Sequence, residues 1–204
     1  MRKVGILGGT FNPPHLGHLI MANEALHAMD LDEVRFMPNF IAPHKEVSGA
    51  DAGQRLEMTR LAISGSAQFQ VEDFEIKHGG VSYTFDTMAR MIEKEPGTEF
   101  YFIIGGDMVD GLGSWYRIDE LIKMVRFIGI KRPGYESSPE LPVAMIDSPE
   151  IHLSSSMLRN RLAKNQTVAF LVPEKVEAYI RKEQLYGSKR NASESEESTS
   201  RKTL

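Results

Sequence analysis

Short apolar runs of strand length alternate along this chain with segments whose apolar residues recur at helical spacing. Strands are predicted over residues 4–7, 34–37, 69–72, 100–104, 125–130 and 143–146. Helices are predicted over 19–29, 51–65, 84–95, around 121, 154–162 and 173–183, with Asp51 and Ser154 as N-caps. Residues 75–82 and the Gly105-Gly106-Asp107 segment read as loops. This alternation predicts an α/β fold, a Rossmann-like doubly wound parallel sheet with helices on both faces.

The composition changes sharply after Gly187. Residues 188–204 contain only Ala192 and Leu204 as apolar residues, among serines and charges of both signs. Such a segment buries too little apolar surface to order itself. We therefore predict one domain over residues 1–187 and a disordered polar tail over residues 188–204.

Charge and cysteine content exclude several classes of protein. The formal net charge of −4 provides no basic field for a nucleic-acid partner. The chain has no cysteine, which excludes disulfides, thiolate metal sites and cysteine nucleophiles. No apolar run approaches membrane-spanning length, and the first strand is too short for a signal sequence. We expect a cytoplasmic protein with no membrane contact.

A strand, a tight loop and a helix meet near the start of the chain. The apolar run Val4–Leu7 leads into Gly8-Gly9-Thr10, and His15 and His18 follow where the helical pattern begins. The two glycines permit positive φ and a close approach of the backbone to a phosphate, and Gly17 leaves room for a ligand between the histidines. A helix N-terminus adds unpaired backbone N–H groups and a positive dipole end. These features predict a binding site for a nucleotide polyphosphate.

Other readings of this stretch have less support. The glycine spacing does not match G-x-G-x-x-G, and G-x-x-x-x-G-K-[ST] is absent from the chain, so dinucleotide-dependent hydride transfer and P-loop hydrolysis lose support. A zinc site at His15 and His18 lacks a third and fourth ligand at a recognisable spacing. The remaining alternative makes one histidine a helix cap and the other a core residue.

Several segments of the chain carry a family resemblance. Gly8–His18 and Ser154–Arg159 resemble the two phosphate-binding motifs of the T/HxGH nucleotidyltransferase superfamily. Between them, the sequence is similar to bacterial nicotinate-nucleotide adenylyltransferases at Pro38–Lys45, Ser82–Thr87, Ile103–Asp107 with Trp115, and Lys131–Gly134. The resemblance spans residues 1–186.

The resemblance implies transfer of the adenylyl group of ATP to nicotinate mononucleotide, with release of pyrophosphate, in NAD biosynthesis. No Asp/Glu cluster of the two-metal kind stands out in the sequence, so we expect Mg²⁺ to arrive with ATP and to be held mainly by phosphates and water, with no metal site in the protein itself. The implied catalytic residues are Thr10, His15, His18, Lys45 and Arg159. The implied ATP-binding residues are Gly8, Gly9, Thr10, Phe11, His15, His18, Ile104, Gly105, Ser155, Ser156 and Arg159. The implied residues for nicotinate mononucleotide are Asn39, Lys45, Tyr83, Thr84, Asp107, Trp115 and Arg132.

Alternatives stay open at this stage. Lys45 is otherwise a solvated surface lysine, Trp115 a core residue and Asp107 a helix cap. Rival classes are a pantetheine-phosphate adenylyltransferase, a noncatalytic nucleotide-binding module and a fragment of a class I aminoacyl-tRNA synthetase. The oligomeric state is also open, with a homodimer as one expectation.

Overall fold

The computed structural model describes residues 1–41, 49–131, 140–149 and 151–189. Its strands are β1 (Arg2–Gly9), β2 (Glu33–Pro38), β3 (Phe69–Val71), β4 (Thr98–Gly105), β5 (Arg126–Ile130) and β6 (Val143–Ile146). Its α-helices are α1 (Leu16–Ala28), α2 (Ala52–Ile63), α3 (Phe74–His78), α4 (Thr84–Lys94), α5 (Gly106–Val109), α6 (Ile118–Met124), α7 (Ser155–Ala163) and α8 (Glu174–Lys182). Short 3-10 segments lie at η1 (Leu112–Ser114) and η2 (Leu185–Gly187).

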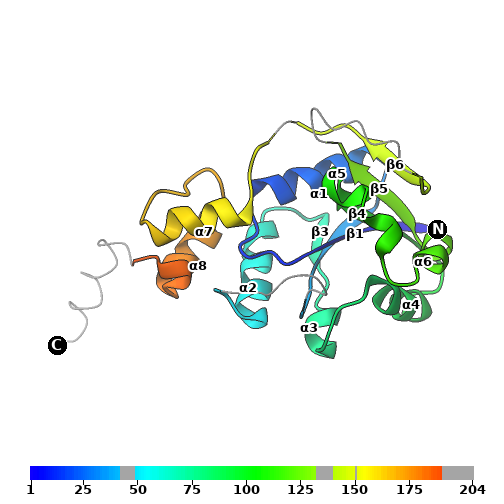
Figure 1. Ribbon diagram of the computed structural model, residues 1–204, viewed down its shortest axis with the longest axis horizontal. Helices are drawn as coiled ribbons and strands as arrows, with labels where there is room; N and C mark the ends of the chain where they lie inside the picture. Colours follow the sequence, from blue (N-terminus) through cyan, green and yellow to red (C-terminus); the bar gives the residue numbers. More distant parts are fainter. Residues whose placement is uncertain (42–48, 132–139, 150, 190–204) are drawn as a thin grey trace.

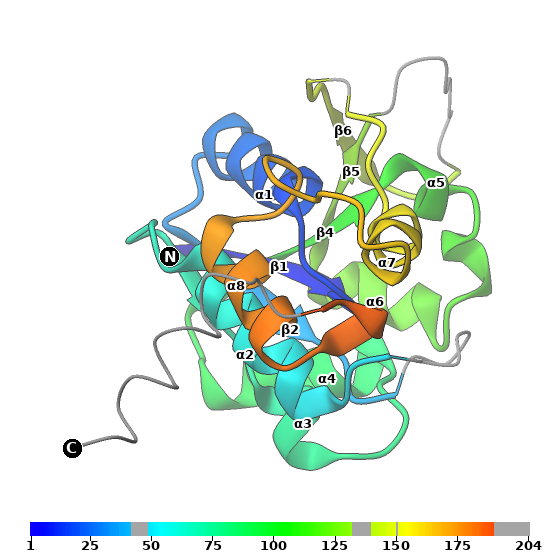
Figure 2. The same cartoon turned by 90° about the vertical axis from the view of Figure 1, so that its left-hand side faces the viewer.

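The strands form one parallel sheet with the order β3-β2-β1-β4-β5-β6. The chain winds outward from β1 to β3, returns to the centre at β4 and then winds outward to β6, and helices flank the sheet (Figures 1 and 2). In open α/β sheets, ligands bind at the carboxyl ends of the strands where this order reverses, which here is between β1 and β4. The predicted Rossmann-like α/β fold is confirmed, and the reversal brings the two predicted glycine junctions together.

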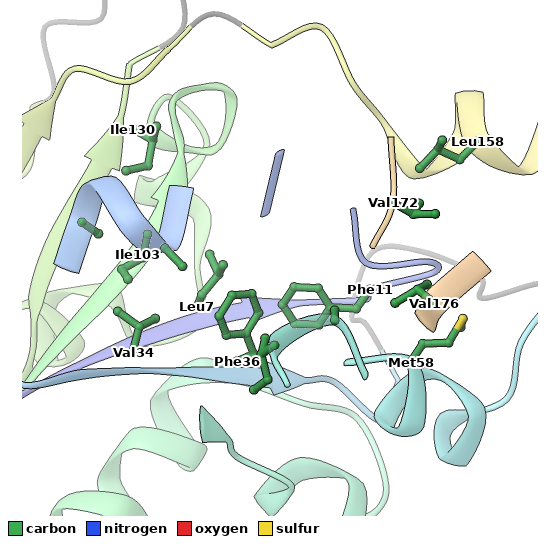
Figure 3. Packing of buried hydrophobic residues seen from close by; sticks show 14 of the residues in the cluster. Leu7, Phe11, Val34, Phe36, Met58, Ile103, Ile130, Leu158, Val172 and Val176 are labelled. Atoms are coloured by element: carbon green, nitrogen blue, oxygen red, sulfur yellow. The ribbon is translucent and has the colours of Figure 1, made fainter. Parts of the chain in front are cut away.

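Alternate residues of the central strands supply two separate cores. Leu7 and Ile103 pack with α1, α2, α7 and α8 on one face, part of which is seen in Figure 3. Ile6 and Phe102 pack with α4 and α6 on the other face. Strands buried on both faces read as continuous apolar runs, which is why the sequence signal for β1 and β4 is strong.

Two predicted caps form as expected. The Asp51 carboxylate accepts a hydrogen bond from the Gln54 backbone N–H at 2.8 Å, and the Gln54 side chain accepts from the Asp51 N–H at 3.0 Å. Ser154 Oγ accepts from the Met157 N–H at 3.2 Å. Each bond satisfies a backbone donor that the first helical turn leaves without a partner.

Two predicted loops contain short helices. Residues 74–78 form α3, which overlaps the segment 75–82 predicted as a loop, and α5 begins directly at Gly106. Helices of four or five residues are too short to show an apolar period, so the sequence pattern was wrong at both places. None of the helices in the described ranges combines the length and the apolar character needed to cross a membrane.

The packed structure reaches slightly beyond the predicted end of the domain. Ser188 is buried, and its hydroxyl donates to the Ile180 carbonyl of α8 at 3.1 Å. The Lys189 N–H donates to Asn165 Oδ1 at 3.1 Å. The predicted tail beyond these contacts, residues 190–204, lies outside the described residues.

Glu75 places a carboxylate in the interior between α3 and α4. Only 7% of the residue is exposed, and Thr87 Oγ1 donates to Glu75 Oε1 at 2.8 Å. Burial raises the pKa of Glu75, although hydrogen bonds from the Thr87 and Ser82 hydroxyls act in the opposite direction. Because the folded pKa lies above the unfolded value, the stabilisation that this group contributes below its unfolded pKa is lost as the pH rises through the folded pKa.

Glu75→Gln is expected to raise the melting temperature at pH 8 and to leave it nearly unchanged at pH 4. The amide retains an acceptor for Thr87 and removes a buried charge that is costly only at the higher pH. A gain of about 1 kcal/mol corresponds to a rise of about 2–4 °C for a chain of this size. Thermal unfolding at both pH values measures the difference. Glu93→Gln, at an exposed position of α4, is the control, and an equal rise in that variant would contradict the assignment.

Candidate active site

A cleft of about 950 Å³ opens at the carboxyl ends of β1 and β4, beside the first turns of α1 and α7. Its walls come from segments that are far apart in the sequence. In the view of Figure 2, β4 lies between α1 and α7. The predicted site residues that line it are Gly8, Gly9, Thr10, Phe11, His15, His18, Ile104, Gly105, Asp107, Ser155, Ser156 and Arg159. The predicted ATP-binding set therefore surrounds one cavity.

The chain turns at Phe11 rather than at the glycines. Gly8 and Gly9 remain within strand β1, and the positive φ of this region is at Phe11, at 48°. The expectation that these glycines supply positive φ is wrong. Packing also requires both glycines, because a Cβ would lie 3.0 Å from Cζ of the buried Phe11 ring at Gly9 and 2.9 Å from Cζ of Phe102 at Gly8. The turn is thus held by a buried aromatic side chain.

Gly17 makes room for a protein side chain. A Cβ at this position would lie 3.0 Å from both Cε1 and Nδ1 of His15. The expectation that Gly17 leaves space for a ligand between the histidines is therefore wrong, since the His15 ring occupies that space. The two imidazoles stack, with centroids 3.7 Å apart and planes 26° apart.

One ring nitrogen of His18 is engaged within the protein. The His15 backbone N–H donates to His18 Nδ1 at 3.1 Å, which assigns the ring proton to Nε2. Burial and the neighbouring His15 together hold the pKa of His18 well below its usual value. His18 is therefore a neutral hydrogen-bond donor at pH 7. This arrangement does not direct two imidazole lone pairs at a shared zinc ion.

The N-terminus of α1 is less open than the sequence suggests. The Leu16 N–H donates to the Leu171 carbonyl at 3.0 Å, and the His18 N–H donates to the His15 carbonyl at 2.9 Å. These donors are engaged by the protein, so the expected set of unpaired N–H groups is reduced at α1. Side chains carry more of the site here than the helix end does.

The start of α7 is bonded to the loop that follows β1. Arg159 Nη1 donates to the Asn12 carbonyl at 2.8 Å, and Arg159 Nη2 donates to Ser156 Oγ at 3.1 Å. Ser155 Oγ donates to the Pro13 carbonyl at 2.9 Å. The two motifs, 142 or more residues apart in the chain, thus form one wall with a guanidinium and two hydroxyls at the cleft.

Tyr186 is a site-supporting residue that the sequence patterns did not reveal. Its hydroxyl donates to Asn12 Oδ1 at 2.6 Å, and burial raises its pKa, so the phenol keeps its proton. Its ring also lies against Gly49, where a Cβ would approach to 2.8 Å. The C-terminal end of the domain therefore braces the loop after β1.

The residues predicted for the second substrate are more dispersed. Asp107 lines the cleft, where its carboxylate folds back over Gly105. Asn39 Nδ2 donates to Oγ1 of the cleft residue Thr10 at 3.4 Å. Lys45 and Arg132 lie outside the described residues.

Aromatic side chains on the α4 side of the sheet lie apart from the cleft. Trp115 packs edge-on against Phe102 and Phe127, with centroids 5.9 and 6.1 Å away, as the core alternative expected. Tyr83 precedes Thr84 at the start of α4 and is 41% exposed, with its ring 5.0 Å from that of Tyr116. Among the predicted residues that the structure describes, four do not line the cleft: Asn39, Tyr83, Thr84 and Trp115.

Comparisons with known proteins agree with this geometry. Residues 6–161 match the cytidylyltransferase-like family. The probable nicotinate-nucleotide adenylyltransferase of Bacillus licheniformis is 48% identical over 187 residues, covering 91% of this chain and 99% of that protein. The Listeria welshimeri protein of the same name is 52% identical over 188 residues, covering 92% and 98%.

A solved structure extends the comparison to three dimensions. The nicotinic acid mononucleotide adenylyltransferase of Plasmodium falciparum, complexed with NaAD, covers 92% of this chain and 98% of its own, with a TM-score of 0.78. At 22% identity this is a likeness of fold. The sequence relatives carry the assignment further, and the chain belongs to the nicotinate-nucleotide adenylyltransferase family.

Proposed function

We propose that the protein transfers the adenylyl group of ATP to nicotinate mononucleotide and releases pyrophosphate. The observation that carries this proposal is the wall formed by the two motifs, in which Arg159 and Ser155 bond to the loop after β1. The cleft beside this wall is lined by an imidazole, by hydroxyl groups and by a guanidinium. These groups donate hydrogen bonds and therefore suit a polyphosphate.

The acceptor phosphate attacks the α-phosphorus of ATP directly. The new bond joins an acceptor phosphate oxygen to that phosphorus, and the bond to the bridging oxygen breaks as its electrons leave with pyrophosphate. His18 is unsuited to act as a nucleophile, because Nδ1 accepts from His15 and Nε2 carries the proton. Catalysis then consists of positioning and of stabilising charge in the transition state.

We assign the ATP phosphates to the wall just described. His18 Nε2–H donates to the transferring α-phosphate, with His15, Thr10 and the backbone of residues 9–11 beside it. Ser156 and Arg159 hold the β and γ phosphates at the start of α7, together with Ser155, which contributes its backbone N–H because its hydroxyl donates to the Pro13 carbonyl. The helix dipole there also favours negative charge. The edge formed by Ile104 and Gly105 receives the nucleoside.

We assign the acceptor to Asp107 in the cleft and to predicted residues outside it. Lys45 binds phosphate, Asp107 binds ribose hydroxyls, and Asn39 lies between the two substrates. Backbone groups near Tyr83 and Thr84 receive the nicotinate carboxylate, and Arg132 lies near the same nucleotide. For Trp115 to stack on the nicotinate ring, its ring must present a surface outside its contacts with Phe102 and Phe127.

Magnesium enters as MgATP in this proposal. In the described ranges, no three or more His, Cys, Asp or Glu side chains gather as a metal site requires. Phosphate oxygens and water suit the ligand preference of Mg²⁺.

We infer that the reaction takes place in the cytoplasm, where ATP is available. We also propose a homodimer, which light scattering tests.

Pyrophosphate release in the presence of ATP, Mg²⁺ and separate acceptors tests the function. Nicotinate mononucleotide is expected to give rapid release and a dinucleotide of the corresponding mass, with much less from the amide form. Pantetheine phosphate is the control for the nearest rival enzyme. Equal turnover of the two mononucleotides would contradict the acceptor assignment, and binding of ATP without any turnover would favour a noncatalytic module.

Tyr186→Phe is expected to weaken binding of a nonhydrolysable ATP analogue by about 2–10-fold, because it removes a hydrogen bond worth roughly 0.5–1.5 kcal/mol to Asn12. Titration calorimetry measures the affinity. Tyr179→Phe removes a phenol of α8 without touching Asn12 and serves as the matched control. Equal affinities in the two variants would show that Tyr186 does not support the loop.

A further inference from the structure

Arg55 is a fully buried cation in the first turn of α2. It heads the set of large side chains that are almost inaccessible, with 1% of the residue exposed. None of the ion pairs in the described part of the chain includes Arg55. Burial lowers its pKa, and electrostatic interactions with Tyr186 and Asp51 act in the opposite direction. A charge in this position is costly unless hydrogen bonds satisfy it. Its acceptors therefore indicate what the residue is for.

The guanidinium of Arg55 joins the segments that follow the neighbouring strands β1 and β2. Nη1 donates to the Thr10 carbonyl at 2.8 Å, in the segment that we call the donor loop, which consists of the last residue of β1 and the turn after it (residues 9–11). Nη2 donates to the Asn39 carbonyl at 2.7 Å and to the Phe40 carbonyl at 3.0 Å, in the loop after β2 that we call the acceptor loop (residues 39–41). One rigid planar group thus sets the spacing of both loops.

Further bonds extend this connection in both directions. The Asn39 N–H donates to the Gly9 carbonyl at 3.0 Å. The Phe40 N–H donates to Ser82 Oγ at 3.1 Å, and the Ser82 N–H donates to the Ile41 carbonyl at 3.0 Å. The acceptor loop is thereby continuous with the segment that leads to α4. Among the described side chains, Arg55 is the one that donates hydrogen bonds to backbone carbonyls of both loops. It reaches one carbonyl in the donor loop and two in the acceptor loop.

We infer that Arg55 is a positioning residue that holds the donor loop and the acceptor loop at a fixed spacing, an inference that rests on the proposed function. It touches no substrate itself. Direct transfer between two bound substrates depends on the separation of their reacting atoms, and an error near 1 Å costs on the order of 100-fold in rate. Lysine retains the charge but has no planar fork with which to span the two loops.

Arg55→Lys is expected to lower kcat by about 10–100-fold at saturating ATP and nicotinate mononucleotide, with the Kd of an ATP analogue changed by less than about threefold. The matched control is Thr59→Val, one turn along α2. Its hydroxyl donates only to the Arg55 carbonyl within the helix, at 2.8 Å. The control is expected to lower the melting temperature and to keep kcat within about twofold. Both variants are assayed at a temperature at which circular dichroism shows them folded.

Amide hydrogen exchange gives a readout that does not depend on turnover. In the wild-type protein, binding of the ATP analogue is expected to slow exchange in residues 39–41 as well as in residues 9–11. In Arg55→Lys the slowing is expected only in residues 9–11. Unchanged exchange at 39–41 in the wild-type protein would overturn the inference even if the variant fails to fold.

The two proposals fail in different ways. A wild-type protein that makes no dinucleotide would refute the proposed function, while the exchange measurement would still decide the role of Arg55. Normal kcat in folded Arg55→Lys, or a loss no larger than that of Thr59→Val, would overturn the inference alone. A fall in ATP affinity as large as the fall in kcat would also overturn it, by confining Arg55 to the ATP site.

Discussion

His18→Ala is expected to lower kcat by about 100–1,000-fold while weakening ATP binding by less than about tenfold, as expected when one preorganised donor to a developing charge is removed. The donor is the Nε2–H, whose orientation follows from the bond between the His15 N–H and His18 Nδ1. Loss of that bond also removes a helix cap, at a cost of about 1 kcal/mol in stability. Steady-state kinetics and titration with an ATP analogue separate the two effects.

The pH profile distinguishes a neutral His18 from a protonated one. Because the pKa of His18 is held well below 6.5, kcat is expected to stay level as the pH rises from 6.5 to 8.5. His27→Ala, at an exposed position in the last turn of the same helix, is the matched control and should keep full activity. A fall in kcat through pH 7 that is absent in His18→Ala would show that the charged ring is required.

Arg159→Ala is expected to lower kcat/KM for ATP by about 10–150-fold, the range that corresponds to loss of a charged hydrogen-bonding group worth about 1.5–3 kcal/mol. The guanidinium both lines the cleft and holds the Asn12 carbonyl at 2.8 Å. Its loss therefore removes a proposed phosphate ligand and loosens the loop after β1. Both KM and kcat are expected to change, in contrast to His18→Ala.

Two further variants separate charge from geometry at this position. Arg159→Lys retains the charge but loses the fork that reaches Asn12 and Ser156, so an intermediate loss is expected. Arg161→Ala, two residues along α7, loses one long bond to the Thr167 carbonyl at 3.4 Å and is the control. If Arg161→Ala lost as much activity as Arg159→Ala, the effect would come from the helix as a whole.

The fold and the two halves of the proposed phosphate site can be predicted from local patterns. Continuous apolar runs indicate strands that are buried on both faces. The glycine pairs Gly8-Gly9 and Gly105-Gly106 indicate where two of those strands end. The order of the strands then brings Gly8 and Gly105 to one edge, which no local pattern states but the switch-point rule predicts. Caps at Asp51 and Ser154 were equally readable, because a cap is a local feature.

Contacts that depend on tertiary packing could not be read in this way. Gly17 accommodates the His15 ring, and the Leu16 N–H is taken by Leu171, a residue more than 150 positions away. Tyr186 reaches Asn12 only after the C-terminal segment has folded against the core. The sequence does contain one indication that Arg55 is buried. It lies at helical spacing from Thr59 and Ala62, on the face of α2 that packs against the core.

The stereochemical course of the reaction tests direct transfer between the two bound substrates most directly. The substrate is one diastereomer of an ATP analogue in which sulfur replaces a non-bridging oxygen of the α-phosphate. The configuration at that phosphorus is then determined in the dinucleotide product. One in-line displacement with no protein nucleophile inverts the configuration, which is the expected result. Retention would reveal two displacements through an adenylylated side chain, and would contradict the assignment of His18 as a donor whose Nδ1 is already engaged.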